Sequence, residues 1–308
     1  MKRLATIDLG SNTVRLLVVE TDGAAWRPVA ETQRVTRLGE GQFTAGRLGE
    51  APMGRTLAVV SDFAAQARRQ GAERLRIVAT SAVREAVNRE EFVSRVAAAT
   101  GERVEVVSGE DEARLTLLGV SAALPALRGA FMLFDIGGGS TEFVLARDGR
   151  PAAAVSLRLG VVPLAEEFVD SGPVSAARWQ ALNERVAGRL ERELPVAIAR
   201  ARAPVLVGTA GTVTTLAALD LGLAAYDAAR VHGHVLSRRA VDGLRARLCA
   251  LSVAERAQLP CLEPGRADVI IPGIAICLGV LAVLGHDSLV VSDRGLREGI
   301  LVEMLGGR

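Results

Sequence analysis

Residues 135–149 read DIGGGSTEFVLARDG, and residues 8–23 read DLGSNTVRLLVVETDG. Both segments contain, in the same order, an aspartate, an apolar residue, a glycine, a small polar loop, an apolar run and an Asp-Gly turn. An apolar run also precedes each aspartate, so each segment predicts a β-hairpin with a glycine-containing loop. Because this unit occurs twice, the sequence predicts two related domains.

The rest of the chain alternates between the patterns of strands and helices. Short apolar runs predict further strands at 74–80, 102–108, 204–209 and 288–293. Amphipathic stretches predict helices at 53–71, 90–101 and 113–124, a long helix at about 175–201, and a terminal helix at about 295–305. This alternation is typical of an α/β fold. We place the domains at residues 1–126 and 127–294, and expect the end of the chain (about 295–308) to pack back on the first domain.

Composition limits the possible partners. The 37 basic and 35 acidic residues leave a net charge of +2, and aromatic residues make up 3% of the chain. Single-stranded nucleic acid is bound by a basic groove with stacking aromatic side chains, so we expect no nucleic-acid partner. A few convergent arginines in one site would still suit a polyanion.

The sequence also argues against a membrane segment and against export. The apolar stretch 269–285 is shorter than the roughly 20 residues that span a bilayer, and Pro272 lies near its start, which favours a buried core helix. The N-terminal residues MKRLATIDLG lack the apolar core of a secretory signal. Three cysteines without C-x-x-C spacing are typical of reduced, buried thiols. We therefore expect a cytoplasmic protein without a membrane partner.

The loop of the first hairpin has the composition of a phosphate-binding site. Gly10 lets the backbone approach a ligand, and consecutive N–H groups can wrap phosphate oxygens. Ser11, Asn12 and Thr13 would add side-chain donors. Asp8 would repel bare phosphate, so it is a candidate ligand for a divalent cation. A tight polar turn without a ligand is the alternative.

The loop of the second hairpin is richer in glycine. Ordering a glycine costs more entropy than ordering any other residue, so three in succession indicate a ligand. Asp135 and Glu142 flank this loop and are candidate ligands for Mg²⁺. The candidate phosphate-binding residues are Gly137, Gly138, Gly139, Ser140 and Thr141.

A third glycine turn follows the predicted strand at 204–209 and opens a helix. Unpaired N–H groups at a helix N-terminus suit an anion or the phosphate end of a nucleotide. Packing between the strand and the helix explains such a turn equally well. The candidate phosphate-binding residues here are Gly208, Thr209, Gly211 and Thr212.

Six motifs occur in a fixed order within residues 4–305. They are DLGSNT, ATSAVREAVN, SGEDEA, DIGGGSTE, GTAGT and DRGLREGIL. In this order they resemble the exopolyphosphatase and guanosine-pentaphosphatase (Ppx/GppA) family. The resemblance implies an actin-like ATPase fold of two ribonuclease H-like domains with a central cleft. It also implies Mg²⁺ dependence, a homodimer, and release of terminal phosphate from polyphosphate or pppGpp.

Two further site residues come from this resemblance. Glu112 matches the family glutamate that is proposed to activate the attacking water, and Arg84 matches an arginine that contacts phosphate. An acidic helix N-terminus is the alternative for Glu112. A surface arginine is the alternative for Arg84.

We interpret two other motifs as structural. Arg294 and Arg297 match the terminal family signature, and a helix cap with salt bridges is the simplest interpretation. His232 and His234 form a His-x-His pair, but no third ligand lies near them in the sequence, so we do not expect a metal site there.

The resemblance is to the short, two-domain members, since longer members carry a further C-terminal domain. Our primary prediction is an exopolyphosphatase in which the terminal phosphate lies between the loops 8–13 and 135–142 and Glu112 activates water. A pppGpp 5′-phosphohydrolase is the alternative. An ATP-dependent phosphotransferase of the same fold and a non-catalytic alarmone-binding module are further alternatives.

Overall fold

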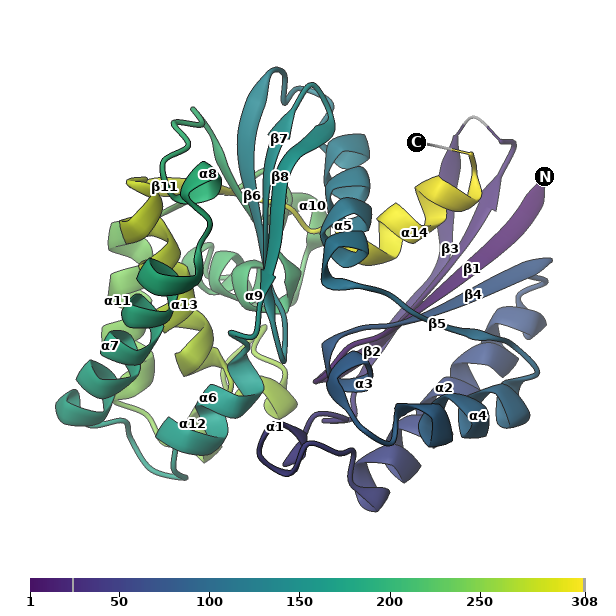
Figure 1. The fold of residues 1–308 in the computed structure, drawn as a ribbon, viewed down its shortest axis with the longest axis horizontal. Helices are drawn as coiled ribbons and strands as arrows, with labels where there is room; N and C mark the ends of the chain where they lie inside the picture. The colour runs from purple at the N-terminus through teal and green to yellow at the C-terminus, as the bar shows by residue number, and fades with distance from the viewer. Residues whose placement is uncertain (24, 307–308) are drawn as a thin grey trace. The chain divides into compact units, whose positions relative to one another are not determined.

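The structure, a computed structural model, describes residues 1–23 and 25–306. The chain divides into two compact units. Unit 1 comprises Met1–Ala122 and the segment from Leu296 onward, and unit 2 comprises Ala123–Gly295. Each unit is an α/β structure built on one mixed sheet (Figure 1).

Unit 1 contains a five-stranded sheet in the order β3-β2-β1-β4-β5. Strands β1 to β3 form an antiparallel meander, whereas β4 runs parallel to β1 and β5 parallel to β4. The strands are β1 Lys2–Leu9, β2 Thr13–Thr21, β3 Trp26–Val35, β4 Arg74–Ala79 and β5 Val104–Val106. The helices are α1 Gln42–Ala45, α2 Glu50–Arg69, α3 Ser81–Glu85, α4 Arg89–Thr100, α5 Gly109–Ala123 and α14 Leu296–Met304.

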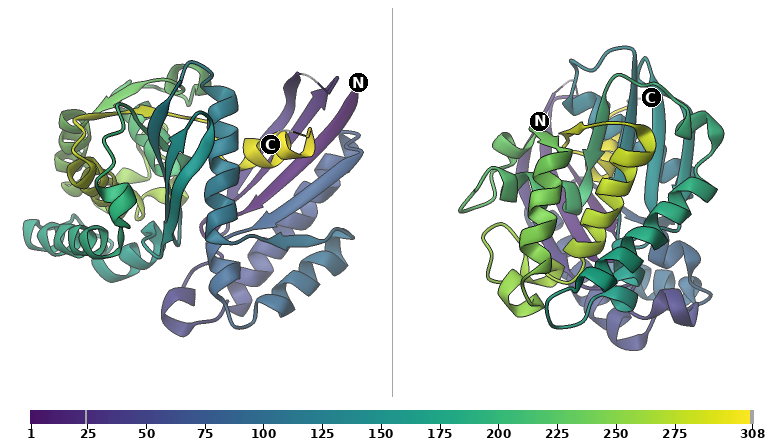
Figure 2. Two further views of the ribbon diagram at one scale, coloured as in Figure 1. Left: turned by 45° about the horizontal axis from the view of Figure 1, so that its top comes forward. Right: turned by 90° about the vertical axis from the view of Figure 1, so that its left-hand side faces the viewer.

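Different helices cover the two faces of this sheet. Successive residues of a strand point to opposite faces. Ile7 and Leu9 of β1 belong to the core that includes residues of α2 and α4. Leu4 packs with Leu301 of α14, and Figure 2 shows α14, in yellow, beside the purple strand β1. Asp8 shares the face of Leu4 and therefore lies on the side that α14 covers.

Unit 2 contains a six-stranded sheet in the order β10-β11-β9-β6-β7-β8. Its order β8-β7-β6-β9 has the same topology as β3-β2-β1-β4, with an antiparallel meander followed by a parallel strand. The strands are β6 Ala130–Ile136, β7 Thr141–Arg147, β8 Arg150–Leu157, β9 Leu206–Thr209, β10 Val235–Ser237 and β11 Ser288–Val291. The helices are α6 Val161–Phe168, α7 Ala176–Glu193, α8 Val196–Ala199, α9 Ala210–Asp220, α10 Ala228–Val231, α11 Arg238–Cys249, α12 Val253–Arg256 and α13 Ile270–Leu284, with a 3₁₀ turn at Pro264–Arg266.

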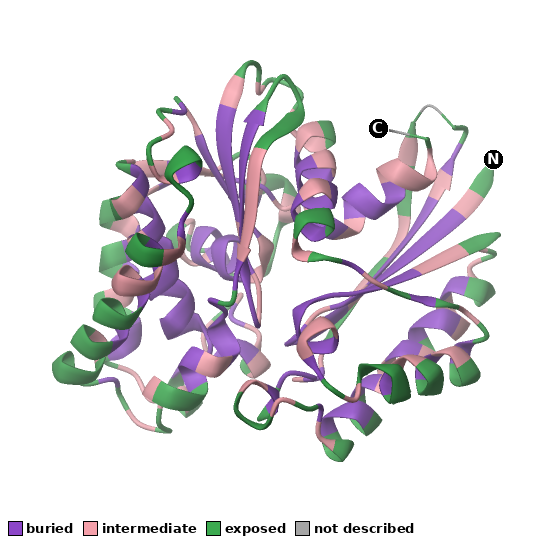
Figure 3. Ribbon diagram, viewed as in Figure 1, coloured by how far each residue is buried: buried purple, intermediate pink, exposed green. Residues whose placement is uncertain are grey.

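Helix α13 is the central helix of unit 2. Most of its side chains are buried (Figure 3), and it packs against α7 and α11. The prediction of a buried core helix for the apolar stretch 269–285 is therefore confirmed. Within the described ranges, every helix falls short of the length and apolarity that a bilayer span requires.

One predicted helix is shorter than expected, and one strand was not predicted. The long helix expected at about 175–201 ends at Glu193, because Pro195 has no N–H to donate inside a helix, and the separate helix α8 follows. Strand β3 was not expected. Its ten residues include no fully buried side chain, so it lacks the apolar run that marks the other strands.

Candidate active site

The first candidate phosphate loop joins β1 to β2. The Gly10 amide donates to the Thr13 carbonyl at 3.1 Å and closes a tight turn. A Cβ at position 10 would lie 2.9 Å from the same carbonyl oxygen, so the turn requires glycine. The Ser11 hydroxyl accepts a hydrogen bond of 3.1 Å from the Ala82 amide in α3, which connects the loop to that helix.

The segment after β3 supports this loop through its carbonyl groups. The Thr36 and Arg37 amides donate to the Asn12 carbonyl, each at 3.0 Å. The Gly39 amide donates to the Ser11 carbonyl at 2.7 Å. The N–H groups of Ser11 and Asn12 have no acceptor among the described residues. These two amides are therefore available to an anion.

Asp8 lies at the end of β1 and is 4% exposed. Arg15 is opposite it in the β1–β2 register, with Nη1 3.5 Å from Asp8 Oδ2. Burial raises the pKa of Asp8, against the opposing attraction of Arg15 and Arg297. In the described part of the chain, Asp8 Oδ1 has no hydrogen-bond donor. A buried carboxylate oxygen without a donor suits a cation or its water shell.

The second candidate loop, between β6 and β7, is closed in the same way. The Gly137 amide donates to the Ser140 carbonyl at 2.9 Å, and a Cβ at position 137 would lie 3.0 Å from that oxygen. The amides of Gly138 and Gly139 have no acceptor among the residues that the structure describes. Both hairpins therefore present two consecutive amides that lack an acceptor among the described residues.

The turn before α6 supports the second loop. The Val162 amide donates to the Gly138 carbonyl at 2.8 Å. A Cβ at Gly160 would lie 2.3 Å from the Gly139 carbonyl carbon and 2.4 Å from the Gly138 oxygen, so only glycine fits there. Thr141, a predicted phosphate ligand, is fully buried and donates its hydroxyl to the Leu159 carbonyl.

Asp135 and Glu142 lie directly opposite each other across β6 and β7. Opposite residues of an antiparallel pair share a face, with Cβ atoms about 5 Å apart, and like charges there are destabilising. Glu142 is 2% exposed and accepts a hydrogen bond of 2.7 Å from the Ser156 hydroxyl.

This carboxylate pair fits a divalent cation. Mg²⁺ is commonly bound through one or two carboxylates, with water and substrate phosphate completing its shell. Among the described residues, no group of three or more His, Cys, Asp or Glu side chains converges on one metal position. The donor set therefore fits a cation that is shared with substrate better than it fits a closed protein cage.

The third glycine turn lies beside the second loop, because Thr209 of β9 is opposite Asp135 of β6. Close packing explains why this turn contains glycine at positions 208 and 211. A Cβ at Gly208 would lie 2.8 Å from the Phe134 ring, and a Cβ at Gly211 would lie 1.8 Å from Arg266 Nη1. The phosphate-binding role of the turn thus stays a prediction.

The two threonines of this turn are also engaged in the protein interior. The Thr209 hydroxyl donates to the carbonyls of Ser292 and Arg294, at 3.0 and 2.9 Å. Thr212 is 8% exposed and lies against Gly273. A ligand at this turn would therefore contact backbone amides more readily than these hydroxyls.

Arg84 and Glu112 meet within unit 1. Arg84 Nη1 donates to Glu112 Oε2 at 2.8 Å and to the Val107 carbonyl at 3.1 Å. Glu112 lies in the first turn of α5 and is 8% exposed. Since α3 carries both Arg84 and the Ala82 amide that binds the first loop, these predicted residues form one connected group.

Two charged residues that were not predicted as site residues interact with Asp8. One is Arg15, which the hairpin register alone would have placed opposite Asp8. The other is Glu298 of α14, which is 2% exposed, raises the pKa of Asp8 and pairs with Arg297 at 2.7 Å. Arg297 also pairs with Glu31 at 2.9 Å. Only tertiary packing brings α14 close to β1, so no local sequence pattern predicted Glu298 as a site residue.

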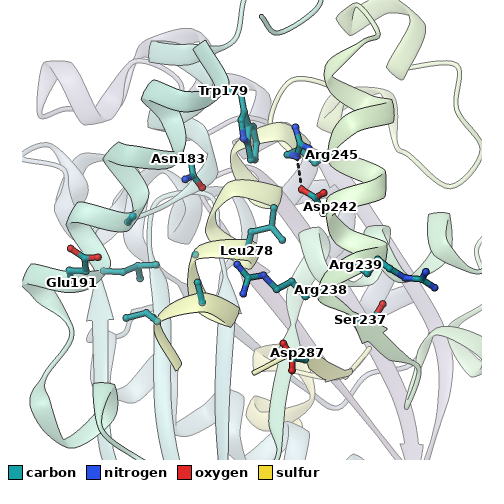
Figure 4. Close-up of a pocket in the computed structure, with 15 residues that line it drawn as sticks. Trp179, Asn183, Glu191, Ser237, Arg238, Arg239, Asp242, Arg245, Leu278 and Asp287 are labelled. Atoms are coloured by element: carbon teal, nitrogen blue, oxygen red, sulfur yellow. Dashed lines mark hydrogen bonds and ion pairs between the residues drawn. The ribbon is translucent and has the colours of Figure 1, made fainter. Parts of the chain in front are cut away.

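A pocket of about 1140 Å³ lies elsewhere in unit 2, between α7, α11 and α13 (Figure 4). Arg245 stacks over the Trp179 ring, 5.4 Å from its centroid, and bonds to Asp242 at 2.7 Å. None of the predicted cation or phosphate ligands lines this pocket. We therefore assign phosphate and cation binding to the hairpin loops and not to this pocket.

Known proteins resemble the chain over its whole length. Residues 17–307 match the model of the Ppx/GppA phosphatase family. Exopolyphosphatase 2 of Mycobacterium tuberculosis is 34% identical over 322 residues, which cover 99% of each protein. Exopolyphosphatase 1 of the same organism is 32% identical over 305 residues, which cover 98% of this chain and 88% of that protein.

Solved structures agree with these relatives. A Ppx/GppA family member from Aquifex aeolicus is 34% identical with a TM-score of 0.82, covering 99% of this chain and 97% of the other. An exopolyphosphatase from Cytophaga hutchinsonii has a TM-score of 0.92 at 27% identity, covering 100% of this chain and 99% of the other. The prediction of a two-domain α/β fold is thus confirmed, because the chain shares its fold with these structures, and the protein is a phosphohydrolase. The chain belongs to the Ppx/GppA phosphatase family.

Proposed function

We propose that this phosphohydrolase is an exopolyphosphatase, which releases terminal orthophosphate from inorganic polyphosphate in the presence of Mg²⁺. The observation that carries the proposal is the register pair Asp135–Glu142 beside a loop of three glycines. One hairpin thereby offers carboxylates to a divalent cation and backbone amides to phosphate oxygens. The relatives that are named exopolyphosphatases support polyphosphate as the substrate.

The proposed cation ligands are Asp135, Glu142 and Asp8. A bound divalent cation neutralises phosphate oxygens and stabilises the charge that develops during transfer. The amides of Gly138 and Gly139, which have no acceptor in the described part of the chain, would donate to oxygens of the terminal phosphate. The buried Oδ1 of Asp8, which lacks a donor within the described residues, supports its place in this set.

Glu112 is proposed to orient the attacking water. Phosphoryl transfer asks the protein mainly to position the nucleophile and to offset charge. The ion pair with Arg84 supports this role because it holds the carboxylate in one orientation. Arg84 also supplies a guanidinium group that suits a phosphate oxygen.

The test is a parallel assay of phosphate release from short polyphosphate, long polyphosphate and pppGpp with Mg²⁺. We expect the parent protein to act faster on polyphosphate than on pppGpp. Glu112→Gln should lower turnover by about 10²- to 10⁴-fold, because it removes a general base or its orienting charge. Binding of polyphosphate should be unchanged in this variant.

Glu110→Gln is the matched control, since Glu110 lies in the same helical turn but is exposed. This variant should keep parental turnover. Faster release from pppGpp would reassign the substrate. Strict dependence on ATP and an acceptor would indicate a phosphotransferase. Full turnover by Glu112→Gln would refute the role given to Glu112.

A further inference from the structure

The chain passes between the two units twice, at Ala122/Ala123 and at Gly295/Leu296. One side chain of unit 2 binds the polypeptide next to both crossings. His232 Nε2 lies 3.1 Å from the carbonyl oxygen of Ala123, and His232 Nδ1 lies 3.2 Å from the amide nitrogen of Asp293. These residues are far apart in sequence, so the imidazole ring joins two separate segments.

These contacts determine which nitrogen of His232 carries the hydrogen. The Ala123 carbonyl can only accept a hydrogen bond, so Nε2 must donate. The Asp293 amide can only donate, so Nδ1 must accept. A neutral ring with hydrogen on Nε2 satisfies both contacts, whereas the other tautomer and the imidazolium ion do not.

The backbone around His232 fixes the position of the ring. His232 ends α10, and its amide donates to the Ala228 carbonyl at 2.9 Å. Gly233 follows with a φ of 80°, and its amide donates to the Val291 carbonyl at 2.8 Å. The partner of His234 is Asp220, at 2.8 Å, so the two histidines serve different contacts and do not converge.

The segment that leaves unit 2 is held from other sides as well. The Tyr226 hydroxyl bonds to the Asp293 carboxylate. The Thr209 hydroxyl, at the third glycine turn, bonds to the carbonyls of Ser292 and Arg294. His232, Tyr226 and the glycine turn therefore meet at one short stretch, 292–294.

We propose that His232 is a positioning residue that clamps both crossings to unit 2 and thereby holds the glycine turn at 208–212 in place. The clamp itself is independent of the substrate. Its effect on turnover rests on the proposed function, because the turn lies beside the second hairpin loop, whose amides that function assigns to phosphate binding.

Three variants of the full chain separate the two contacts. His232→Asn keeps an acceptor near the position of Nδ1 and loses the donor that reaches Ala123. His232→Gln keeps a donor near Nε2 and loses the acceptor for Asp293. His232→Ala loses both. His286→Asn is the control, because the His286 ring makes no hydrogen bond within the described residues.

Residue-resolved amide exchange by NMR measures the clamp directly. The Asp293 amide should exchange about five- to tenfold faster in His232→Ala and His232→Gln, since one hydrogen bond is lost. It should keep its protection in His232→Asn. The last amides of α5 should show the converse pattern, with protection kept in His232→Gln. Equal Asp293 exchange in all three variants and the parent would overturn the proposal.

Two further measurements complete the test. Of the three histidines of the chain, His232 should show the Nε2–H tautomer in long-range ¹H–¹⁵N spectra, and any other form would contradict the clamp. His232→Ala should lower kcat for polyphosphate about tenfold, with partial recovery in His232→Asn. If the parent releases no phosphate at all, the proposed function fails, while exchange and tautomer still decide the clamp.

Discussion

The hairpin loops at 8–13 and 135–142 share one backbone design and differ in their charges. In both, a glycine amide closes the turn onto the carbonyl three residues later, at 3.1 Å for Gly10 and 2.9 Å for Gly137. At the equivalent register position, however, Asp8 faces Arg15 whereas Asp135 faces Glu142. The first hairpin thus pairs its aspartate with a basic residue in the register, whereas the second pairs its aspartate with another acidic residue.

The two loops also differ in what supports them. The first is held by the segment after β3, where a Cβ at Gly39 would meet the end of the Phe43 ring at 2.9 Å. The second is held by the turn at Gly160, where a Cβ would meet backbone at 2.3 Å. A repeated sequence unit can thus keep the backbone of its hairpin loop while the segments that support the loop diverge.

The largest expected effect comes from Glu142→Gln, which removes one charge of the second hairpin and keeps the side-chain shape. We expect turnover to fall by about 10³-fold, because the cation loses a ligand that offsets phosphate charge. Addition of Mg²⁺ should raise the melting temperature of the parent protein and not of the variant.

Ser156→Ala is the control. It removes the hydrogen bond to Glu142 but no charge, so the Mg²⁺-dependent shift should persist. A Glu142→Gln protein that still responds to Mg²⁺ would place the cation elsewhere.

A smaller effect distinguishes the two supports. Gly160→Ala should lower the free energy of unfolding by about 3 kcal/mol, because the added methyl group meets backbone that has no rotamer to change. Gly39→Ala should cost about 1 kcal/mol, because the Phe43 ring can shift. Urea denaturation measures both. Equal losses of unfolding free energy would show that both supports accommodate an added methyl group equally well.

The hairpins and the buried helix at 269–285 could be predicted from the sequence because their signals are local. A short apolar run before each Asp-x-Gly predicts both a strand and the turn that follows it. The unbroken apolar stretch at 269–285 predicts the buried helix α13. Strand β3 lacked such a signal because it is an edge strand whose residues stay partly exposed.

The candidate site was predictable to the extent that its residues lie within motifs. Asp135 and Glu142 flank one loop, so sequence placed them together. The hydrogen bond of Arg84 to Glu112 joins α3 to α5. The electrostatic effect of Arg297 and Glu298 on Asp8 depends on a helix from the end of the chain. Such contacts arise from tertiary packing, which periodicity and spacing do not encode.

The smallest expected effect tests the dependence of the first hairpin on α14. Glu303 of this helix pairs with Arg76 of β4 at 2.5 Å and with Arg114 of α5 at 2.6 Å. Burial alone would raise the pKa of Glu303, but hydrogen bonds from Arg76 and Arg114 outweigh it and lower the pKa below its ordinary value of 4.5. The unfolded chain therefore takes up a proton first as pH falls, so this contribution to stability is present above pH 4.5 and is lost below it.

Glu303→Gln should thus lower the free energy of unfolding by about 1 kcal/mol at neutral pH, a small value because the side chains are partly exposed. The difference between variant and parent should shrink as pH falls below 4.5 through the lowered pKa of Glu303, as measured by denaturation at neutral and at acidic pH. Amide exchange should increase in α14 and at the end of β1, whereas the loop at 135–142 should be unaffected, since it belongs to the other unit. An equal increase of amide exchange in both hairpins would show that α14 does not act on the first hairpin alone. The two hairpins would then differ only in the residue opposite each aspartate.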